Sequence, residues 1–192
     1  MSLQTAIPLE LIEEMLKKKG SAMIRINGCS MAPLLADGST ASLFALDGQE
    51  VFPGEIVCFK AGPHLVTHRV VKSWDEGKNR FFLTRGDNAK AFDRPVAREA
   101  ILGKVTAING IPVTGYLWSF MNRFMSALLL LQARLAQARK SFAYRLLARA
   151  KRGLGIRVSF YPALLFMATL PFTATKYLLN RICLRASSSR KS

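Results

Sequence analysis

Ser30 and the two histidines of the chain have residue types and surroundings that could support nucleophilic catalysis. Ser30 lies between Gly28 and Pro33, which together predict a turn that exposes the serine at a fixed position. Serine is a poor nucleophile unless a base lies within hydrogen-bond reach, and histidine has an unperturbed pKa suited to that role near neutrality. The chain contains only 2 histidines, His64 and His68. These residues indicate acyl transfer by a serine, with backbone N–H groups of the turn facing a developing oxyanion.

The segments around Ser30 and His68 belong to a longer series of short motifs. In chain order they are Gly28-Cys29-Ser30-Met31-Ala32-Pro33-Leu34-Leu35, Gly54-Glu55-Ile56-Val57, His68-Arg69-Val70-Val71, Thr84-Arg85-Gly86-Asp87-Asn88, Asp93 and Gly103-Lys104-Val105. Their order and spacing resemble the successive boxes of the signal peptidase I family. The bacterial branch of that family has a lysine where this chain has His68. The sequence is therefore similar to the archaeal and endoplasmic-reticulum branch, which uses serine, histidine and aspartate.

The resemblance implies a role for each matching residue. Ser30 would attack the scissile carbonyl, and His68 would take its proton and later return it to the leaving amine. Asp93 matches the aspartate that orients the imidazole. Asp87, in the Gly-Asp-Asn box, is a competing candidate, and the residues alone leave both open because an aspartate in such a turn also commonly bonds its own backbone.

The oxyanion site departs from the family pattern. Many members carry a serine two positions before the nucleophile, whereas this chain has Gly28. The turn formed by Gly28, Cys29 and Ser30 is therefore expected to supply backbone N–H donors. Losing one oxyanion donor typically costs about two to three orders of magnitude in rate, so turnover could be slow.

The cysteines predict neither a disulfide framework nor a metal site. Cys29, Cys58 and Cys183 are odd in number and far apart in sequence. We interpret them as reduced and mostly buried, with Cys29 as a packing residue and not a thiol nucleophile. No metal and no organic cofactor is expected.

The elements that must position these residues are predicted to be short strands. Pro8–Lys19 has the pattern of a helix, with acids early, lysines late and Gly20 after its end. From Ala22 the apolar period changes to two, and turn signals recur at short intervals. The predicted strands are Ala22–Ile26, Thr40–Leu46, Glu55–Lys60, Leu65–Trp74, Arg80–Thr84 and Ile101–Ile108. This pattern predicts a mainly β domain, a small coiled antiparallel sheet or partly open barrel, and the resemblance implies the signal peptidase type.

Charge divides the chain near residue 110. All 12 acidic residues lie at or before Glu99, whereas 14 of the 28 Lys and Arg residues lie after Gly110. Apolar residues from Leu117 to Leu146 recur at helical spacing. We therefore expect an N-terminal helix in residues 1–20, a peptidase domain in residues 21–110, and a basic, α-helical, membrane-binding extension in residues 111–192.

Membrane association is predicted from that extension. Residues 158–175 are uncharged and long enough to span, but they include Pro162 and Pro171, so spanning and interfacial insertion both remain open. Basic residues interleaved with apolar runs favour lipid over nucleic acid as a partner, because no nucleic-acid reading module is recognisable. The acids of Met1–Glu14 predict no cleavable targeting segment and no anchor at that end. Positive charge before residue 158 favours a cytoplasmic domain, opposite to the usual working side of a signal peptidase, so the side stays open.

The sequence thus predicts a membrane-associated serine endopeptidase that cleaves signal-peptide-like or membrane-proximal polypeptides after small residues. Two alternatives remain. The first is a self-cleaving regulator that resembles the LexA family, although the segment before Ala22 is short for a DNA-binding domain and His68 replaces a lysine. The second is a membrane adaptor that has the fold without catalysis.

Overall fold

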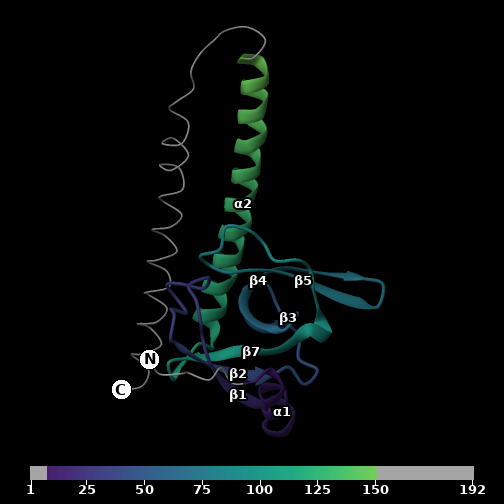
Figure 1. Cartoon of the computed structure of the whole chain (residues 1–192), viewed down its shortest axis with the longest axis vertical. Coiled ribbons are helices and arrows are strands. Elements are labelled where there is room, and N and C mark those ends of the chain that lie inside the picture. The colour runs from purple at the N-terminus through teal and green to yellow at the C-terminus, as the bar shows by residue number, and fades with distance from the viewer. Residues whose placement is uncertain (1–7, 151–192) are drawn as a thin grey trace.

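The computed structural model describes residues 8–150, apart from the side chains of residues 117 and 139–150. This part of the chain is mainly β. It contains one antiparallel sheet of eight strands, a short helix before the sheet and a long helix after it (Figure 1).

Helix α1 (Leu9–Lys19) confirms the predicted first element. Gly20 ends it in the left-handed region at φ 68°, and its N–H donates to the carbonyl oxygen of Leu16 at 3.0 Å. Glycine adopts this conformation without steric cost, so the helix stops here and β1 begins at once. Ile12 and Leu16 form the buried face of the helix.

The sheet contains the six predicted strands, with ends that coincide or differ by one or two residues, and two strands that were not predicted. The strands are β1 (Ser21–Arg25), β2 (Thr40–Ala45), β3 (Ile56–Ala61), β4 (His64–Glu76), β5 (Asn79–Arg85), β6 (Val96–Ala97), β7 (Ile101–Ile108) and β8 (Ile111–Pro112). A 3₁₀ turn, η1 (Arg98–Ala100), precedes β7. The two-residue strands β6 and β8 are too short to show an apolar period in the sequence.

The sheet is open and curled. Its order is β1-β2-β7-β3-β4-β5-β6, with β8 added to β7, so β1 and β6 lie at opposite ends of the sheet. Strands that are far apart in the sequence are neighbours in the sheet, because β7 inserts between β2 and β3. The mainly β prediction is confirmed.

The turn between β1 and β2 is anchored in the core. Met31, Leu34 and Leu35 of this turn are buried against the inner residues of β1 and β2. Burial of three apolar side chains fixes the backbone on which Ser30 stands, while Ser30 itself remains exposed.

Helix α2 (Tyr116–Ala150) is one continuous helix. Trp118, Met125 and Leu129 are buried in its first part, and its later turns extend beyond the sheet (Figure 1). No helix within the described residues has a stretch long and apolar enough to cross a membrane. The uncharged segment 158–175 and Cys183 lie outside the described residues.

Candidate active site

Ser30, His68 and Asp93 lie in one hydrogen-bonded chain. Nε2 of His68 lies 3.0 Å from Oγ of Ser30, and Nδ1 of His68 lies 2.6 Å from Oδ2 of Asp93. The three residues come from the turn after β1, from β4 and from the segment between β5 and β6. This is the arrangement in which an imidazole can accept the serine proton while the carboxylate holds the other ring nitrogen as a donor.

Thr84 holds Asp93 in place. Its hydroxyl donates to Oδ2 of Asp93 at 2.7 Å, and the Asp93 N–H donates to the Thr84 carbonyl oxygen at 2.9 Å. The carboxylate oxygen that faces His68 is therefore oriented by a buried side chain at the end of β5. Sequence reasoning gave Thr84 no role of its own, although it opens the Thr84–Asn88 motif.

Asp87 has a different partner from Asp93. Its two carboxylate oxygens accept from Nε and Nη2 of Arg69 at 2.8 Å and 2.7 Å, and both side chains are fully buried. Arg69 follows His68 on β4, and successive residues of a strand point to opposite faces of the sheet. The two aspartates that the sequence left open thus belong to separate clusters, Asp93 with His68 and Asp87 with Arg69.

A loop clamps the serine turn against His68. The N–H of Asn88 donates to the Ser30 carbonyl oxygen at 2.7 Å, and its side-chain amide donates to the carbonyl oxygen of Cys29 at 3.2 Å. At Gly86, a Cβ would lie 2.5 Å from the Ser30 carbonyl oxygen and 3.0 Å from Nε2 of His68. Only glycine fits this close approach.

The backbone donors expected for an oxyanion are only partly free. The N–H of Gly28 donates to Oδ1 of Asp37 at 2.7 Å, so this group is already paired in the structure. The N–H groups of Cys29 and Ser30 have no acceptor among the described residues. These two backbone groups are therefore candidate donors to an oxyanion.

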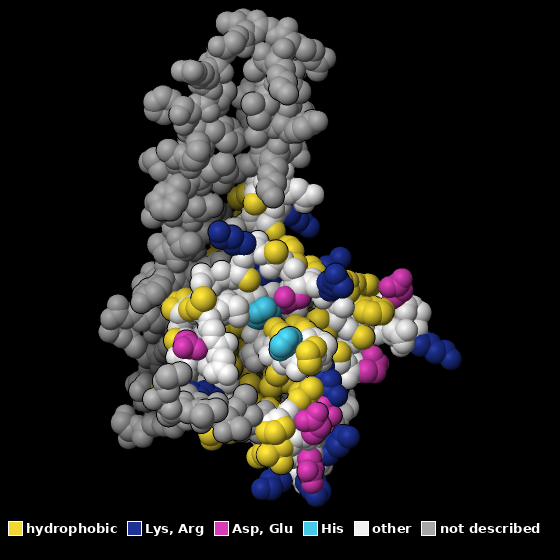
Figure 2. All heavy atoms as spheres, viewed as in Figure 1, with side chains coloured by type: hydrophobic (Ala, Val, Ile, Leu, Met, Phe, Trp, Pro, Cys, Tyr) yellow, Lys and Arg dark blue, Asp and Glu magenta, His cyan; other side chains and the backbone are white. Residues whose placement is uncertain are grey.

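A groove of about 570 Å³ opens beside Ser30 and His68. Its walls include Ile12 of α1, Ile24 of β1 and Val66 of β4. Figure 2 shows both histidine side chains on this face, next to hydrophobic side chains. His64 is exposed and lines the same groove, whereas His68 is 8 % exposed, so only His68 combines shelter with a serine contact.

Two strand edges border the groove. β1 pairs only with β2, and the part of β4 before Arg69 pairs with β3 alone, within the described residues. Each edge therefore presents backbone N–H and carbonyl groups that an extended chain could pair with.

The cysteines differ from one another. Cys58 is buried, its thiol accepts from the hydroxyl of Thr67 at 3.6 Å, and burial raises its pKa to about 12. Such a thiol is unreactive at neutral pH. Cys29 is exposed, because the turn that buries Met31 points the Cys29 side chain outward, so its assignment as a packing residue is wrong.

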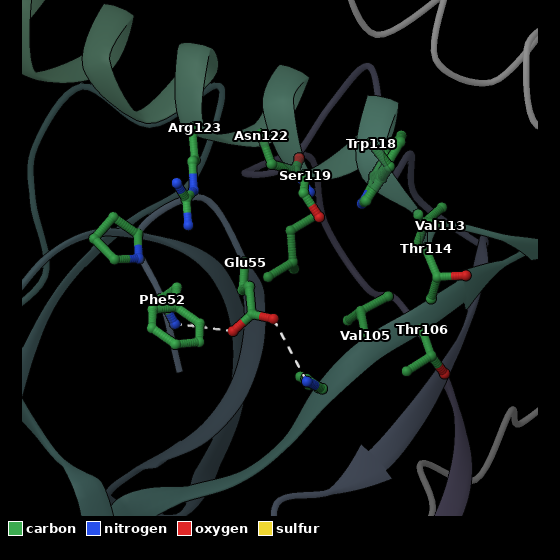
Figure 3. A pocket seen from close by; sticks show the side chains of 14 residues that line it. Phe52, Glu55, Val105, Thr106, Val113, Thr114, Trp118, Ser119, Asn122 and Arg123 are labelled. Carbon is green, nitrogen blue, oxygen red and sulfur yellow. Dashed lines mark hydrogen bonds and ion pairs between the residues drawn. The ribbon is translucent and has the colours of Figure 1, made fainter. Parts of the chain in front are cut away.

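A second cavity, of about 260 Å³, lies beneath the first turns of α2 (Figure 3). Glu55 stands in it, accepting from the N–H of Phe52 at 2.9 Å and pairing with Lys104 at 3.5 Å. Trp118 and Asn122 of α2 form part of its wall. No group of three or more His, Cys, Asp or Glu side chains that could hold a metal ion occurs among the described residues.

No protein-family model matches the chain, and no curated protein is significantly similar to it.

Proposed function

We propose that this protein is a serine endopeptidase of the signal peptidase I type, with Ser30 as nucleophile, His68 as general base and Asp93 as the orienting carboxylate. The observation that supports the proposal best is the contact of His68 with both Ser30 and Asp93. Three separate segments of the chain meet at this one imidazole. The order of motifs in the sequence and the open, curled antiparallel sheet are compatible with this family.

The proposed reaction begins with transfer of the Ser30 Oγ proton to Nε2 of His68 as Oγ attacks the scissile carbonyl carbon. Asp93 keeps the Nδ1 proton in place and stabilises the imidazolium that forms. The N–H groups of Cys29 and Ser30 would donate to the oxyanion. His68 then returns the proton to the leaving amine, and water, activated by His68, releases the acyl group from Ser30.

The proposed substrate is an extended segment of a polypeptide. The free edges of β1 and β4 support strand addition, in which main-chain hydrogen bonds hold the substrate and pockets select its side chains. Ile24 and Met31 line the groove next to Ser30, and such an apolar lining favours small apolar side chains over charged ones. No metal and no organic cofactor is required by this reaction.

We also propose that α2 attaches the enzyme to an anionic lipid surface. Tyr116, Phe120, Phe124 and Leu131 are exposed on one side of α2, opposite to the face that packs on the sheet. Arg123 and Arg134 lie at the border of this apolar strip, and no acidic residue occurs after Glu99. An exposed apolar strip bordered by cations fits the boundary between headgroups and acyl chains.

The peptidase proposal is tested by Ser30→Ala in the full chain, assayed in detergent micelles with a preprotein that carries a signal peptide. Loss of the nucleophile should lower kcat on the order of 10⁶-fold. Ser73→Ala, a serine on β4 away from the cluster, is the matched control and should leave the rate unchanged. Processing that continues unchanged in Ser30→Ala would show that Ser30 is not the nucleophile, and the absence of processing by the unaltered protein would favour the adaptor alternative.

The lipid proposal is tested by co-sedimentation with vesicles of phosphatidylcholine alone or with added phosphatidylglycerol. The double variant Phe120→Asp, Phe124→Asp should reduce binding to the anionic vesicles at least tenfold, because each buried Phe contributes about 1.5–3 kcal/mol. Phe44→Asp, an exposed phenylalanine on β2, is the control. Equal binding by both variants would contradict a role for this face of α2.

A further inference from the structure

Helix α2 is seated directly against the strands that carry the candidate active site. The hydroxyl of Ser126 donates to the carbonyl oxygen of Val70 at 2.8 Å, two residues beyond His68 on β4. At Gly54, a Cβ would lie 2.7 Å from the backbone carbon of Asn122. Glycine at this position thus lets the helix backbone approach the chain just before β3.

Arg69 connects α2 to the sheet. Its side chain is fully buried, and its Nη1 donates both to the carbonyl oxygen of Gly54, at 2.9 Å, and to Oδ1 of Asn122. Its other two nitrogens donate to Asp87. A buried guanidinium must have its N–H groups satisfied, so the orientation of Arg69 depends on an acceptor that α2 supplies.

The contacts continue from Arg69 to the serine turn. Asp87, held by Arg69, lies between Gly86, which packs against Ser30 and His68, and Asn88, which donates to Ser30. The Asp87 N–H also lies 3.4 Å from the sulfur of Met31, the residue after Ser30. A displacement of Arg69 would therefore reach the candidate active site from two directions, through its neighbour His68 and through the loop that clamps Ser30.

We propose that Asn122 is a positioning residue of the active site, so that α2 is a structural part of the peptidase and not only its attachment to a surface. Figure 3 shows Asn122 on the turn of α2 that roofs the second cavity. Asn122 touches none of the three candidate catalytic residues in the contacts described. It acts through Arg69 and Asp87 on the distance between Oγ of Ser30 and Nε2 of His68.

This inference rests on the proposed peptidase activity, and its expected effect is on kcat. Asn122→Ala removes the acceptor and should lower kcat about 10- to 100-fold with KM within twofold, since small misplacements of reacting groups have effects of this size. Asn122→Asp keeps an oxygen acceptor for Arg69 and should restore most of the rate. Ser119→Ala, an exposed position one turn earlier on α2, is the control and should match the unaltered protein.

The second readout follows the imidazole itself and needs no turnover. In NMR spectra of the ring nitrogens, the unaltered protein should show His68 with Nδ1 protonated, and His64→Gln assigns the signal because the chain has only 2 histidines. Asn122→Ala should shift the ring-nitrogen signals of His68, whereas Asn122→Asp and Ser119→Ala should not. Rates are compared per folded molecule, with the folded fraction taken from chemical unfolding of each variant.

Two results would overturn the inference. The first is a His68 signal and a kcat in Asn122→Ala that both match the unaltered protein. The second is a fall in rate that the folded fraction alone explains, which would leave Asn122 with a role in stability only. If instead Ser30→Ala retained processing while Asn122→Ala still shifted His68, the peptidase proposal would fail and the link between α2 and His68 would stand.

Discussion

His68 and Arg69 are adjacent on β4, yet they belong to two clusters with opposite physical character. The side chains of His68 and Asp93 are 11 % and 27 % exposed, and His68 lines the groove. Those of Arg69 and Asp87 are both 0 % exposed, and Arg69 contacts Asn122 of α2. Successive residues of β4 point to opposite faces of the sheet, so the strand separates two clusters. Substrate could reach the cluster of His68 and Asp93, whereas the cluster of Arg69 and Asp87 is fully buried. The same residue types, an aspartate with a cationic or basic partner, therefore form the proposed catalytic pair on one face and a buried ion pair on the other.

Asp93→Asn should give the largest separation between activity and stability. An amide in place of the carboxylate no longer holds His68 with Nδ1 protonated, and kcat should fall about 10⁴-fold. The free energy of unfolding should change by about 1 kcal/mol or less, because Asp93 remains partly exposed. Steady-state kinetics and urea unfolding on the same preparation measure both. A small kinetic effect would place the orienting group elsewhere.

Asp87→Ala should show the opposite balance. Removal of Asp87 leaves the Arg69 guanidinium buried without its counter-charge, which typically lowers the free energy of unfolding by about 3–5 kcal/mol. Chemical unfolding measures this loss. Asp75→Ala is the control, because Asp75 forms only an exposed 3.9 Å pair with Arg80 and should cost about 0–1 kcal/mol. Similar losses of stability in the two variants would show that the buried Arg69–Asp87 pair contributes no more than the surface pair.

Gly54→Ala tests how closely α2 packs against the buried cluster of Arg69 and Asp87. Gly54 has φ 105°, and a methyl group there would meet the backbone of Asn122 and Arg123 at 2.7–2.9 Å. Backbone strain and overpacking together should destabilise the fold by about 3 kcal/mol or more. Gly62→Ala is the matched control, since its φ is 61° with open space around it, and about 1–2 kcal/mol is expected. Thermal unfolding of both variants measures the difference in stability. Equal losses of stability would mean that α2 moves to accommodate the methyl group at little cost.

Thr84→Val should have the smallest effect of these variants. It tests how far the cluster of His68 and Asp93 depends on the hydroxyl of Thr84. The variant keeps the shape of the side chain and removes the hydroxyl that donates to Asp93 at 2.7 Å. Without this donor the carboxylate is held less firmly against His68, so kcat should fall about tenfold. Thr84→Ser retains the donor and should recover most of the rate in the same preprotein assay. If Val and Ser behave alike, Asp93 does not depend on this hydroxyl.

Much of the secondary structure was predictable from local signals. The helix ending at Gly20 and the six main strands follow from capping residues, an apolar period of two and frequent turns. Ser30 and His68 were identified because each lies in a distinct motif. The short strands β6 and β8 carry no period to recognise, and the exposure of Cys29 depends on how its turn folds over Met31.

The sequence by itself determined which side chains could do chemistry, since a turn serine, two histidines and two loop aspartates can be read from the residues. It could not pair them. The partner of each aspartate depends on which face of β4 each lies against. Only the tertiary structure decided that Asp93 meets His68 while Asp87 meets Arg69. It also decided that Asn122, 53 residues beyond Arg69, completes the buried cluster, because contacts at such separation leave no local pattern in the chain.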